Sequence, residues 1–407
     1  MADHVAIIGA GQAGAAVAEK LRANGFQGPI TLFGEEAHEP YQRPPLSKKF
    51  LSGEWPAERL AIRSPAHWPS KQIELVTSTP VTAVDIQAKT LTAGNISIPW
   101  TKLVFATGAA PRPRPPEFTG RSNVYELRGL DDAIRLKAVM HPGQSMVVIG
   151  GGYVGLETAA VAVKLGLQVT VIERASRILE RVACERTASI LREIHRQNWV
   201  QIIEGCKVQK VTGVEQASTV TLDDGRVIDA DIILVGIGVL PHTILAQASG
   251  ISCDDGILVD AFGRTSAQDV WAAGDCARFP LNGEMIRLES VPNAIDQAEC
   301  IADDIVGQSR PYSPIPWFWS DQYDLKLQMV GLTNGFDTRI ERATDKGQSL
   351  WYFRQGHMLG TVAINDPSAF MAAKKMLTTA TTPSLAEAAD SAFDPIQWMK
   401  KASQKAA

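Results

Sequence analysis

Two short glycine-rich segments hold the residues whose spacing is best suited to grip a phosphate group. Each carries three glycines in the pattern G-x-G-x-x-G, follows an apolar run and opens a helix-like stretch. The first glycine permits the tight turn from strand to helix, the second lets backbone approach a pyrophosphate, and the third allows helix and strand to pack closely. The anion then lies on the free N–H groups of the helix N-terminus. The six glycines are Gly9, Gly11, Gly14, Gly150, Gly152 and Gly155.

An acidic residue follows each glycine segment at the distance expected for a dinucleotide-binding unit. Glu35 ends the strand-like run at residues 30–34, and Glu173 ends the run at residues 168–172. In such a unit the acid hydrogen-bonds the ribose hydroxyls. Two complete units predict two dinucleotides held at once, one to deliver electrons and one to receive them, which is the plan of a flavoprotein reductase.

The choice between NADH and NADPH depends on Glu173. A carboxylate there binds the ribose 2′-hydroxyl and repels a 2′-phosphate, so we expect NADH. Arg174 and Arg177 leave an alternative open, because an arginine at this place can receive the phosphate. Both can equally be solvated charges at the start of a helix.

The elements that must position these groups divide the chain into three parts. A buried strand-like run ends in Thr107-Gly108, where backbone can touch a ligand, and the proline-rich residues 111–116 form a stiff boundary. We expect an α/β protein with two Rossmann-like dinucleotide-binding domains and an α+β C-terminal domain. The expected boundaries are residues 1–112 with 240–311 for the first, discontinuous domain, 113–239 for the second and 312–407 for the third.

Composition and charge narrow the function classes. The 407 residues, 45% of them apolar and 21% charged, are too many for one core and typical of a globular protein. A net charge of −4 gives no reason to expect nucleic acid or an anionic membrane as a partner. The first strand starts at once, which leaves no room for a signal peptide, and no apolar run is long enough to span a bilayer. We therefore expect the protein in the cytoplasm.

Cysteine and histidine positions argue against metal and dithiol chemistry. The five cysteines are scattered with no C-x-x-C or C-x-x-x-x-C pair, and the seven histidines show no ligand spacing. We therefore expect no metal site, no disulfide framework and no redox-active dithiol. The last point excludes the disulfide reductases that use the same two-dinucleotide plan.

Several short motifs occur in order along nearly the whole chain. They are the two glycine segments, Arg-Pro-Pro-Leu-Ser-Lys at 43–48, Ala-Thr-Gly at 106–108, Ala-Gly-Asp at 273–275, Glu-Ser-Val-Pro-Asn-Ala at 289–294 and Trp-Phe-Trp-Ser-Asp-Gln at 317–322. Together they resemble the FAD-dependent, NADH-linked ferredoxin reductases of bacterial oxygenase systems, a group that includes the putidaredoxin-type reductases and those of Rieske dioxygenases. The resemblance implies a glutathione reductase-like fold, with FAD in the first dinucleotide domain and NADH in the second.

The resemblance also implies which residues contact each cofactor. Asp275 resembles the acid that accepts a hydrogen bond from a ribityl hydroxyl, although an isolated Gly-Asp more often caps a helix. Val81 and Val291 would act through backbone atoms. The implied FAD contacts are Gly9, Gly11, Ala13, Gly14, Glu35, Arg43, Lys48, Val81, Thr107, Gly108, Arg128, Asp275 and Val291. The implied NADH contacts are Gly150, Gly152, Tyr153, Gly155, Glu157, Glu173 and Gly238.

Three residues are expected at the reacting groups. Lys48 resembles the family's lysine near the flavin N5 edge, where a fixed cation favours the reduced flavin. Glu157 resembles the glutamate at the nicotinamide, which can pair with that lysine; such a residue otherwise often only compensates a helix dipole. Trp319 resembles the aromatic beside the isoalloxazine ring, on the side from which electrons leave. Trp317 and Phe318 are expected to be ordinary packing residues.

The expected activity passes electrons from NADH through FAD to a small [2Fe–2S] ferredoxin. That ferredoxin would feed a haem-thiolate monooxygenase or a Rieske dioxygenase in aromatic hydrocarbon catabolism. One alternative is a reductase with a small acceptor, such as an NADH oxidase, a peroxidase or monodehydroascorbate reductase; the peroxidase type is disfavoured because no cysteine precedes Arg181. Another is a redox-sensing interaction protein of the apoptosis-inducing-factor type. The residues leave open the partner-facing surface and the choice of monomer or dimer.

Overall fold

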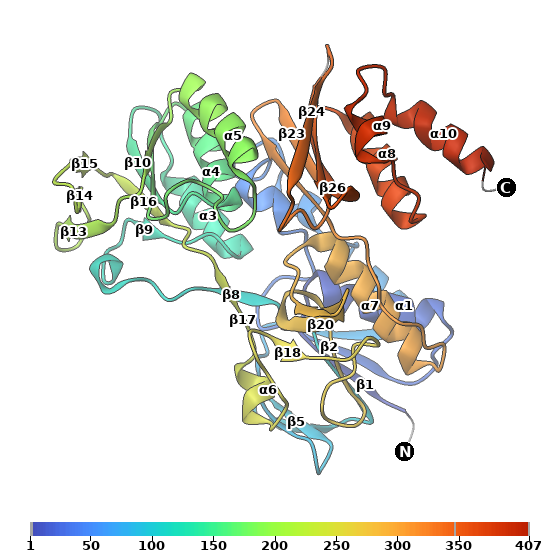
Figure 1. The fold of residues 1–407 in the computed structure, drawn as a ribbon. Helices are drawn as coiled ribbons and strands as arrows, with labels where there is room; N and C mark the ends of the chain where they lie inside the picture. Colours follow the sequence, from blue (N-terminus) through green and yellow to red (C-terminus); the bar gives the residue numbers. More distant parts are fainter. Residues whose placement is uncertain (1–2, 346, 406–407) are drawn as a thin grey trace. The chain divides into compact units, whose positions relative to one another are not determined.

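A computed structural model describes residues 3–345 and 347–405 of the chain (Figure 1). These residues form two compact units. The first unit comprises the chain up to Glu289 together with Ala294–Tyr312, and the second comprises Ser290–Asn293 and the chain from Ser313 onward. Both glycine segments therefore lie in the first unit.

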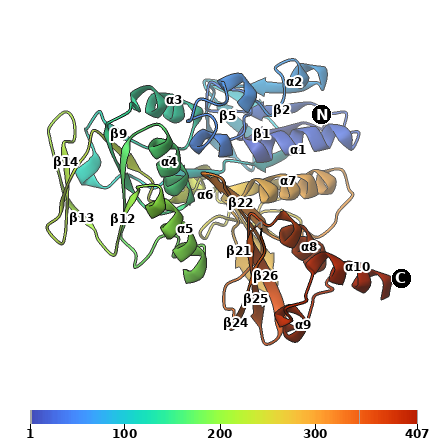
Figure 2. The same ribbon diagram turned by 90° about the horizontal axis from the view of Figure 1, so that it is seen from above.

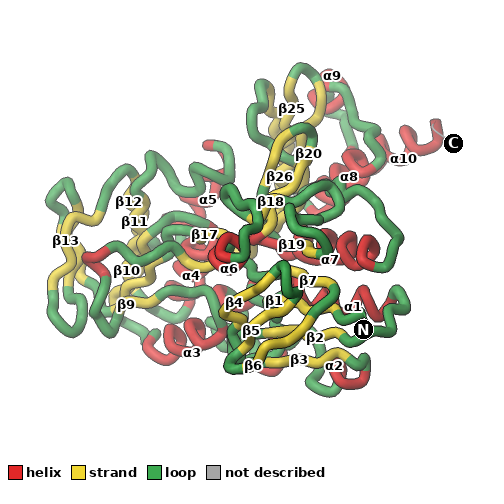
Figure 3. The backbone as a smooth tube through the Cα atoms, turned by 90° about the horizontal axis from the view of Figure 1, so that it is seen from below, coloured by secondary structure: helices red, strands yellow, loops and turns green. Residues whose placement is uncertain are grey.

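The first glycine segment belongs to a five-stranded parallel sheet. The strands are β1 (Val5–Ile8), β2 (Ile30–Phe33), β3 (Ile73–Val76), β7 (Lys102–Phe105) and β19 (Val270–Ala272). Their order is β19-β7-β1-β2-β3, and Figure 3 shows β7, β1, β2 and β3 as neighbours. Helices α1 (Gln12–Ala23) and α7 (Val291–Ile305) lie side by side in Figures 1 and 2, and their small apolar residues share one core with the sheet. The near-continuous burial of β1 and β2 is typical of parallel strands covered on both faces.

The second glycine segment belongs to another five-stranded parallel sheet. The strands are β9 (Val124–Tyr125), β10 (Ser145–Ile149), β11 (Gln168–Glu173), β12 (Gln201–Glu204) and β16 (Ile232–Val235), in the order β12-β11-β10-β16-β9. The accompanying helices are α3 (Leu130–Val139), α4 (Tyr153–Lys164) and α5 (Glu185–Gln197). The two sheets repeat the same strand–loop–helix start, so two equivalent ligand sites are expected at their carboxyl ends.

Short strands, antiparallel apart from the parallel pair β18–β20, complete the first unit. Strands β8 (Ala109–Pro111) and β17 (Val239–Pro241) pair, so the chain enters and leaves the second parallel sheet through one two-stranded ribbon. The remaining strands are β4 (Val81–Asp85), β5 (Thr90–Ala93), β6 (Ile96–Pro99), β13 (Val208–Thr212), β14 (Thr219–Leu222), β15 (Val227–Asp229), β18 (Ile257–Leu258), β20 (Ala277–Leu281) and β21 (Glu284–Ile286). The remaining helices are α2 (His67–Ser70) and α6 (Ile244–Ala248).

The second unit is built on an antiparallel sheet. Its strands are β22 (Trp317–Gln322), β23 (Leu325–Gly331), β24 (Thr338–Ala343), β25 (Gln348–Arg354) and β26 (His357–Ile364), in the order β22-β23-β26-β25-β24. Three helices follow: α8 (Pro367–Thr378), α9 (Leu385–Ala389) and α10 (Pro395–Lys405). The core forms where α8 packs on the sheet through residues such as Phe370 and Met376.

The expected fold class is confirmed: two Rossmann-like parallel sheets are joined to a C-terminal α+β part. The exact domain boundaries stay a prediction, although the ribbon of β8 and β17 lies where the proline-rich boundary was expected. None of the described helices is long and apolar enough to cross a membrane.

Candidate active site: two dinucleotide cradles joined by an ion pair

The first glycine loop is shaped by close backbone contacts on either side of an open position. Gly9 has a φ of +114°, and a Cβ there would lie 2.2 Å from the carbonyl oxygen of Ala106. A Cβ at Gly14 would lie 2.0 Å from the carbonyl oxygen of Gly9. A Cβ at Gly11, which caps α1, would meet no atom within 4 Å. This open space at a helix N-terminus fits a pyrophosphate.

The second loop repeats this geometry. A Cβ at Gly150 would lie 2.4 Å from the carbonyl oxygen of Gly236, and one at Gly155 would lie 2.4 Å from that of Gly150. A Cβ at Gly152, the N-cap of α4, would meet nothing within 4 Å. Both loops therefore offer the same open cradle, as the two-dinucleotide interpretation requires.

The two acids at the strand ends differ in their surroundings. Glu35 is exposed, so its carboxylate is accessible to the ribose of a dinucleotide. Glu173 is half-buried, and its two carboxylate oxygens accept hydrogen bonds from the backbone N–H groups of Gly151 and Ala175, each at 2.7 Å. The carboxylate is therefore fixed beside the second glycine loop. Arg177, an alternative phosphate ligand, forms an ion pair with Glu185 at 3.1 Å.

Lys48 and Glu157 meet in the first unit although 109 positions in sequence separate them. Lys48 follows a 3₁₀ helix at Pro44–Ser47, and Glu157 lies in the first turns of α4. The lysine Nζ lies 2.7 Å from Glu157 Oε2, and the two side chains are 15% and 4% exposed. This buried charge pair links two regions. Lys48 belongs to the segment after β2 of the first parallel sheet, and Glu157 belongs to helix α4, which packs with the second parallel sheet. The pairing suggested by the resemblance is therefore present in the structure.

Sequence reasoning did not single out Ser47, which also contacts Glu157. Its Oγ donates a hydrogen bond of 2.6 Å to Glu157 Oε2, the same oxygen that faces Lys48. The only sequence signal was its place next to the lysine in the Leu-Ser-Lys motif.

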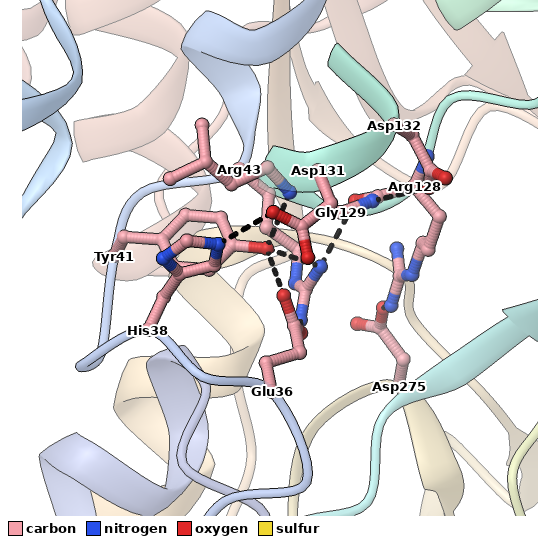
Figure 4. Close-up of polar contacts among 10 residues, drawn as sticks. Glu36, His38, Tyr41, Arg43, Arg128, Gly129, Asp131, Asp132 and Asp275 are labelled. Atoms are coloured by element: carbon pink, nitrogen blue, oxygen red, sulfur yellow. Dashed lines mark hydrogen bonds and ion pairs between the residues drawn. The ribbon is translucent and has the colours of Figure 1, made fainter. Parts of the chain in front are cut away.

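A second polar cluster holds the segment around Arg43 in place (Figure 4). Arg43 forms an ion pair with Glu36 and donates to the hydroxyl of Tyr41 at 3.0 Å and to the carbonyl of Arg128 at 2.9 Å. Tyr41 donates to Glu36 at 2.5 Å and accepts from the backbone N–H of Leu130 at 2.9 Å. Burial raises the pKa of Tyr41, so its hydroxyl stays protonated and donating. Glu36 and Tyr41 were not foreseen, although they lie only seven and two positions before Arg43, because no motif marks their side chains.

Arg128, Asp275 and Gly108 converge at the carboxyl end of the first sheet. Arg128 Nη2 lies 3.5 Å from Asp275 Oδ2 (Figure 4). A Cβ at Gly108 would lie 3.5 Å from the same nitrogen. Burial raises the pKa of Asp275, and Arg128 opposes this shift. A half-buried acid and base with one long contact between them can hydrogen-bond a polar ligand such as a ribityl chain or a phosphate. The residues present therefore fit FAD.

The remaining candidates lie in several elements of both units. The hydroxyl of Thr107 donates to the carbonyl of His242 at 2.6 Å. A ligand is therefore expected to contact Thr107 through its backbone. Tyr153 starts α4, and burial together with the charge of Glu157 raises its pKa. Trp319 lies in β22 of the second unit, with its ring centroid 5.6 Å from that of Trp317. The further candidates are Ala13, buried in α1; Val81, half-buried in β4; Gly238, with a φ of +97° after β16; and Val291, at the start of α7. The roles of all these residues stay predictions.

The two cradles, the charge pair between them and the Arg128–Asp275 pair define a two-dinucleotide flavoprotein oxidoreductase. Residues 3–298 match the family described as pyridine nucleotide-disulphide oxidoreductase, and residues 317–397 match a reductase C-terminal family. The chain belongs to the pyridine nucleotide-disulphide oxidoreductase family.

Individual relatives place it more narrowly. It is 40% identical over 396 residues to rhodocoxin reductase of Rhodococcus erythropolis, covering 96% of this chain and 93% of the relative. It is 38% identical over 388 residues to putidaredoxin reductase CamA of Pseudomonas putida, covering 92% of each. Among solved structures, the covalent putidaredoxin reductase–putidaredoxin complex gives a TM-score of 0.95 at 35% identity, covering 98% of this chain and 99% of the other. The expected family and its cofactors, FAD and NADH, are thereby confirmed, and the protein is an oxidoreductase of the ferredoxin reductase type.

Proposed function

We propose that this protein transfers electrons from NADH through FAD to a [2Fe–2S] ferredoxin that serves an oxygenase. The observation that carries the proposal is the buried Lys48–Glu157 pair, since it joins the segment that follows β2 of the first sheet to the helix that opens at the second glycine loop. The names of the relatives support the acceptor, because they include putidaredoxin reductase and the ferredoxin–NAD(+) reductase component of a p-cumate 2,3-dioxygenase system.

FAD, when bound, accepts a hydride from NADH and releases the two electrons one at a time. The chain's own residues bind, orient and set the local charge. Gly11 and Gly152 open the cradles to the two pyrophosphates, and Arg128 and Asp275 are placed to hold the FAD ribityl and phosphate groups. Lys48 supplies positive charge where the reduced flavin becomes electron-rich.

Two residues decide how the nicotinamide dinucleotide is bound. Glu173, fixed by two backbone N–H groups, accepts from the ribose hydroxyls and repels a 2′-phosphate. Glu157 lies at the end of the cradle where Lys48 enters, so it orients the nicotinamide side of the cofactor. We assign Trp319 to the exit path of the electrons on the basis of its motif.

The test is to mix the FAD-loaded protein with NADH and candidate acceptors and to follow each acceptor's absorbance. A [2Fe–2S] ferredoxin such as putidaredoxin should be reduced much faster than oxygen or the ascorbyl radical. Fast reduction of a small acceptor without ferredoxin turnover would favour the small-acceptor alternative. Slow NADH oxidation with every acceptor would favour the redox-sensing alternative.

We also propose that the protein acts in the cytoplasm, where its NADH is supplied. Cell fractionation tests this location: NADH-dependent ferredoxin reduction that sediments with the membranes would contradict it.

A further inference from the structure

The hydroxyl of Ser47 is committed to a side chain from the other nucleotide-binding region. Ser47 and Glu157 are each 4% exposed, and Ser47 Oγ lies 2.6 Å from Glu157 Oε2. Lys48 Nζ lies 2.7 Å from the same oxygen. Glu157 Oε2 therefore accepts a hydrogen bond from the neutral hydroxyl of Ser47 and faces the positive charge of the adjacent Lys48.

The alternative role for this hydroxyl is local. A serine at the end of a 3₁₀ helix often donates to the carbonyl three residues earlier, here that of Pro44. That oxygen lies 3.5 Å from Ser47 Oγ, against 2.6 Å for the carboxylate. A hydroxyl has one proton, so the shorter, charge-assisted bond takes it.

The backbone that carries Ser47 is rigid. Two prolines open the 3₁₀ helix and fix its φ angles, and the backbone N–H of Lys48 donates to the carbonyl of Pro45 at 3.0 Å. Leu46, 2% exposed, anchors the same turn in a core that includes Leu130 at the start of α3. Ser47 therefore holds its hydroxyl at a fixed point, whereas Lys48 reaches the carboxylate through a flexible four-carbon stem.

We propose that Ser47 is a positioning residue for the reaction of the two dinucleotides. It holds the Glu157 carboxylate in one rotamer, and the fixed carboxylate in turn holds the ammonium of Lys48 in place. The proposal rests on the proposed function only in that NADH reduces FAD in this site, and it is independent of the final acceptor.

The charged and titratable groups around Glu157 agree with this role. Lys48 faces it from the end of the 3₁₀ helix. Tyr153 faces it from its own helix and stays a neutral phenol, because burial and the Glu157 charge raise its pKa. Cys184, at the start of α5, interacts with Tyr153.

The test compares Ser47→Ala with Ser47→Thr, which keeps the hydroxyl, and with Ser52→Ala. Ser52 is a matched control because its hydroxyl bonds within its own loop: Oγ donates to the carbonyl of Lys49 at 3.1 Å and accepts from the backbone N–H of Glu54 at 3.4 Å. Flavin reduction by NADH is followed by anaerobic stopped flow. The carboxylate stretch of Glu157, which responds to the hydrogen bond from Ser47, is recorded by infrared difference spectroscopy, with Glu157→Gln identifying its band.

Loss of a hydrogen bond to a buried charge corresponds to about a ten- to hundred-fold effect. Ser47→Ala should slow flavin reduction by about ten-fold or more and shift the frequency of the Glu157 carboxylate band. Ser47→Thr should restore most of both, and Ser52→Ala should match the unmodified protein. The dissociation constant for NAD⁺ should change by less than about three-fold.

Three results would overturn the proposal. An unchanged rate and an unchanged carboxylate band in Ser47→Ala would show that the hydroxyl does not act through Glu157. A slower rate with an unshifted band would assign Ser47 to general structure. Equal losses in Ser47→Thr would assign the effect to packing. If NADH failed to reduce FAD in the unmodified protein, the proposed function would fall as well, whereas a failure with ferredoxin alone would leave this inference intact.

Discussion

Alanine at the middle glycine of each loop should separate the two cofactor sites. Gly11 and Gly152 have extended backbone angles, with φ of −93° and −79°, so alanine fits both positions without strain. A Cβ at either position meets no protein atom within 4 Å. The added methyl group therefore intrudes only on the space assigned to a pyrophosphate.

Two separate losses set the size of the expected effect, one in protein stability and one in cofactor affinity. Alanine is a poorer N-cap than glycine, which costs the protein about 0.5 to 1 kcal/mol of stability. Crowding a methyl group against a bound phosphate costs about 1 to 3 kcal/mol, which is about ten- to hundred-fold in affinity. Gly11→Ala should weaken FAD binding by this factor and leave NADH binding to the remaining holoenzyme unchanged. Gly152→Ala should weaken NADH binding and leave FAD affinity unchanged.

The matched controls are Gly14→Ala and Gly155→Ala. Their Cβ atoms would lie 2.0 Å and 2.4 Å from backbone oxygens of their own loops, so these variants should lose about 3 kcal/mol of stability or fail to fold. FAD affinity is measured by flavin fluorescence, NADH affinity by the saturation of stopped-flow flavin reduction, and stability by thermal melting of the FAD-free protein. The cofactor assignment would be refuted if Gly152→Ala lost FAD while Gly11→Ala kept it.

Three further predictions concern single side chains. Glu157→Gln should destabilise the holoenzyme by about 3 kcal/mol, because it leaves the Lys48 ammonium buried without its counter-charge. A double-mutant cycle with Lys48→Met should show a coupling free energy of more than about 1 kcal/mol between the two side chains. Additive losses in chemical unfolding would contradict this. Glu173→Gln should raise the NADH dissociation constant about ten-fold or more, because an amide oxygen can replace only one of the two carboxylate acceptors. The preference for NADH over NADPH should become smaller. An unchanged ratio of the NADH and NADPH dissociation constants would count against the role of Glu173. Burial raises the pKa of the Cys300 thiol from 9.0 to about 11, so its contribution to stability is complete below pH 9 and is lost as the pH rises to about 11. The loss should reach about 2 to 3 kcal/mol, and Cys300→Ala but not Cys184→Ala should flatten the pH dependence of thermal unfolding in that range.

Much of the fold could be predicted because its signals are local. The glycine spacing, the apolar runs before it and the acids after it all act within about thirty residues, and each describes one strand–loop–helix–strand unit. The proline-rich stretch after Gly108 likewise marked a boundary through local backbone stiffness. The pairing of Lys48 with Glu157 was expected only through family resemblance, because no local rule relates residues so far apart.

The amino-acid sequence by itself determined that two phosphate cradles exist and which acid follows each, since a tight turn and a helix N-terminus are properties of neighbouring residues. Only the tertiary structure decided what surrounds them. Glu36, Tyr41 and Arg43 are joined through the start of α3, and Ser47 and Lys48 share one oxygen of Glu157. These contacts depend on how two sheets and their connecting ribbon place distant backbone segments, which residue types and spacing along a chain do not specify.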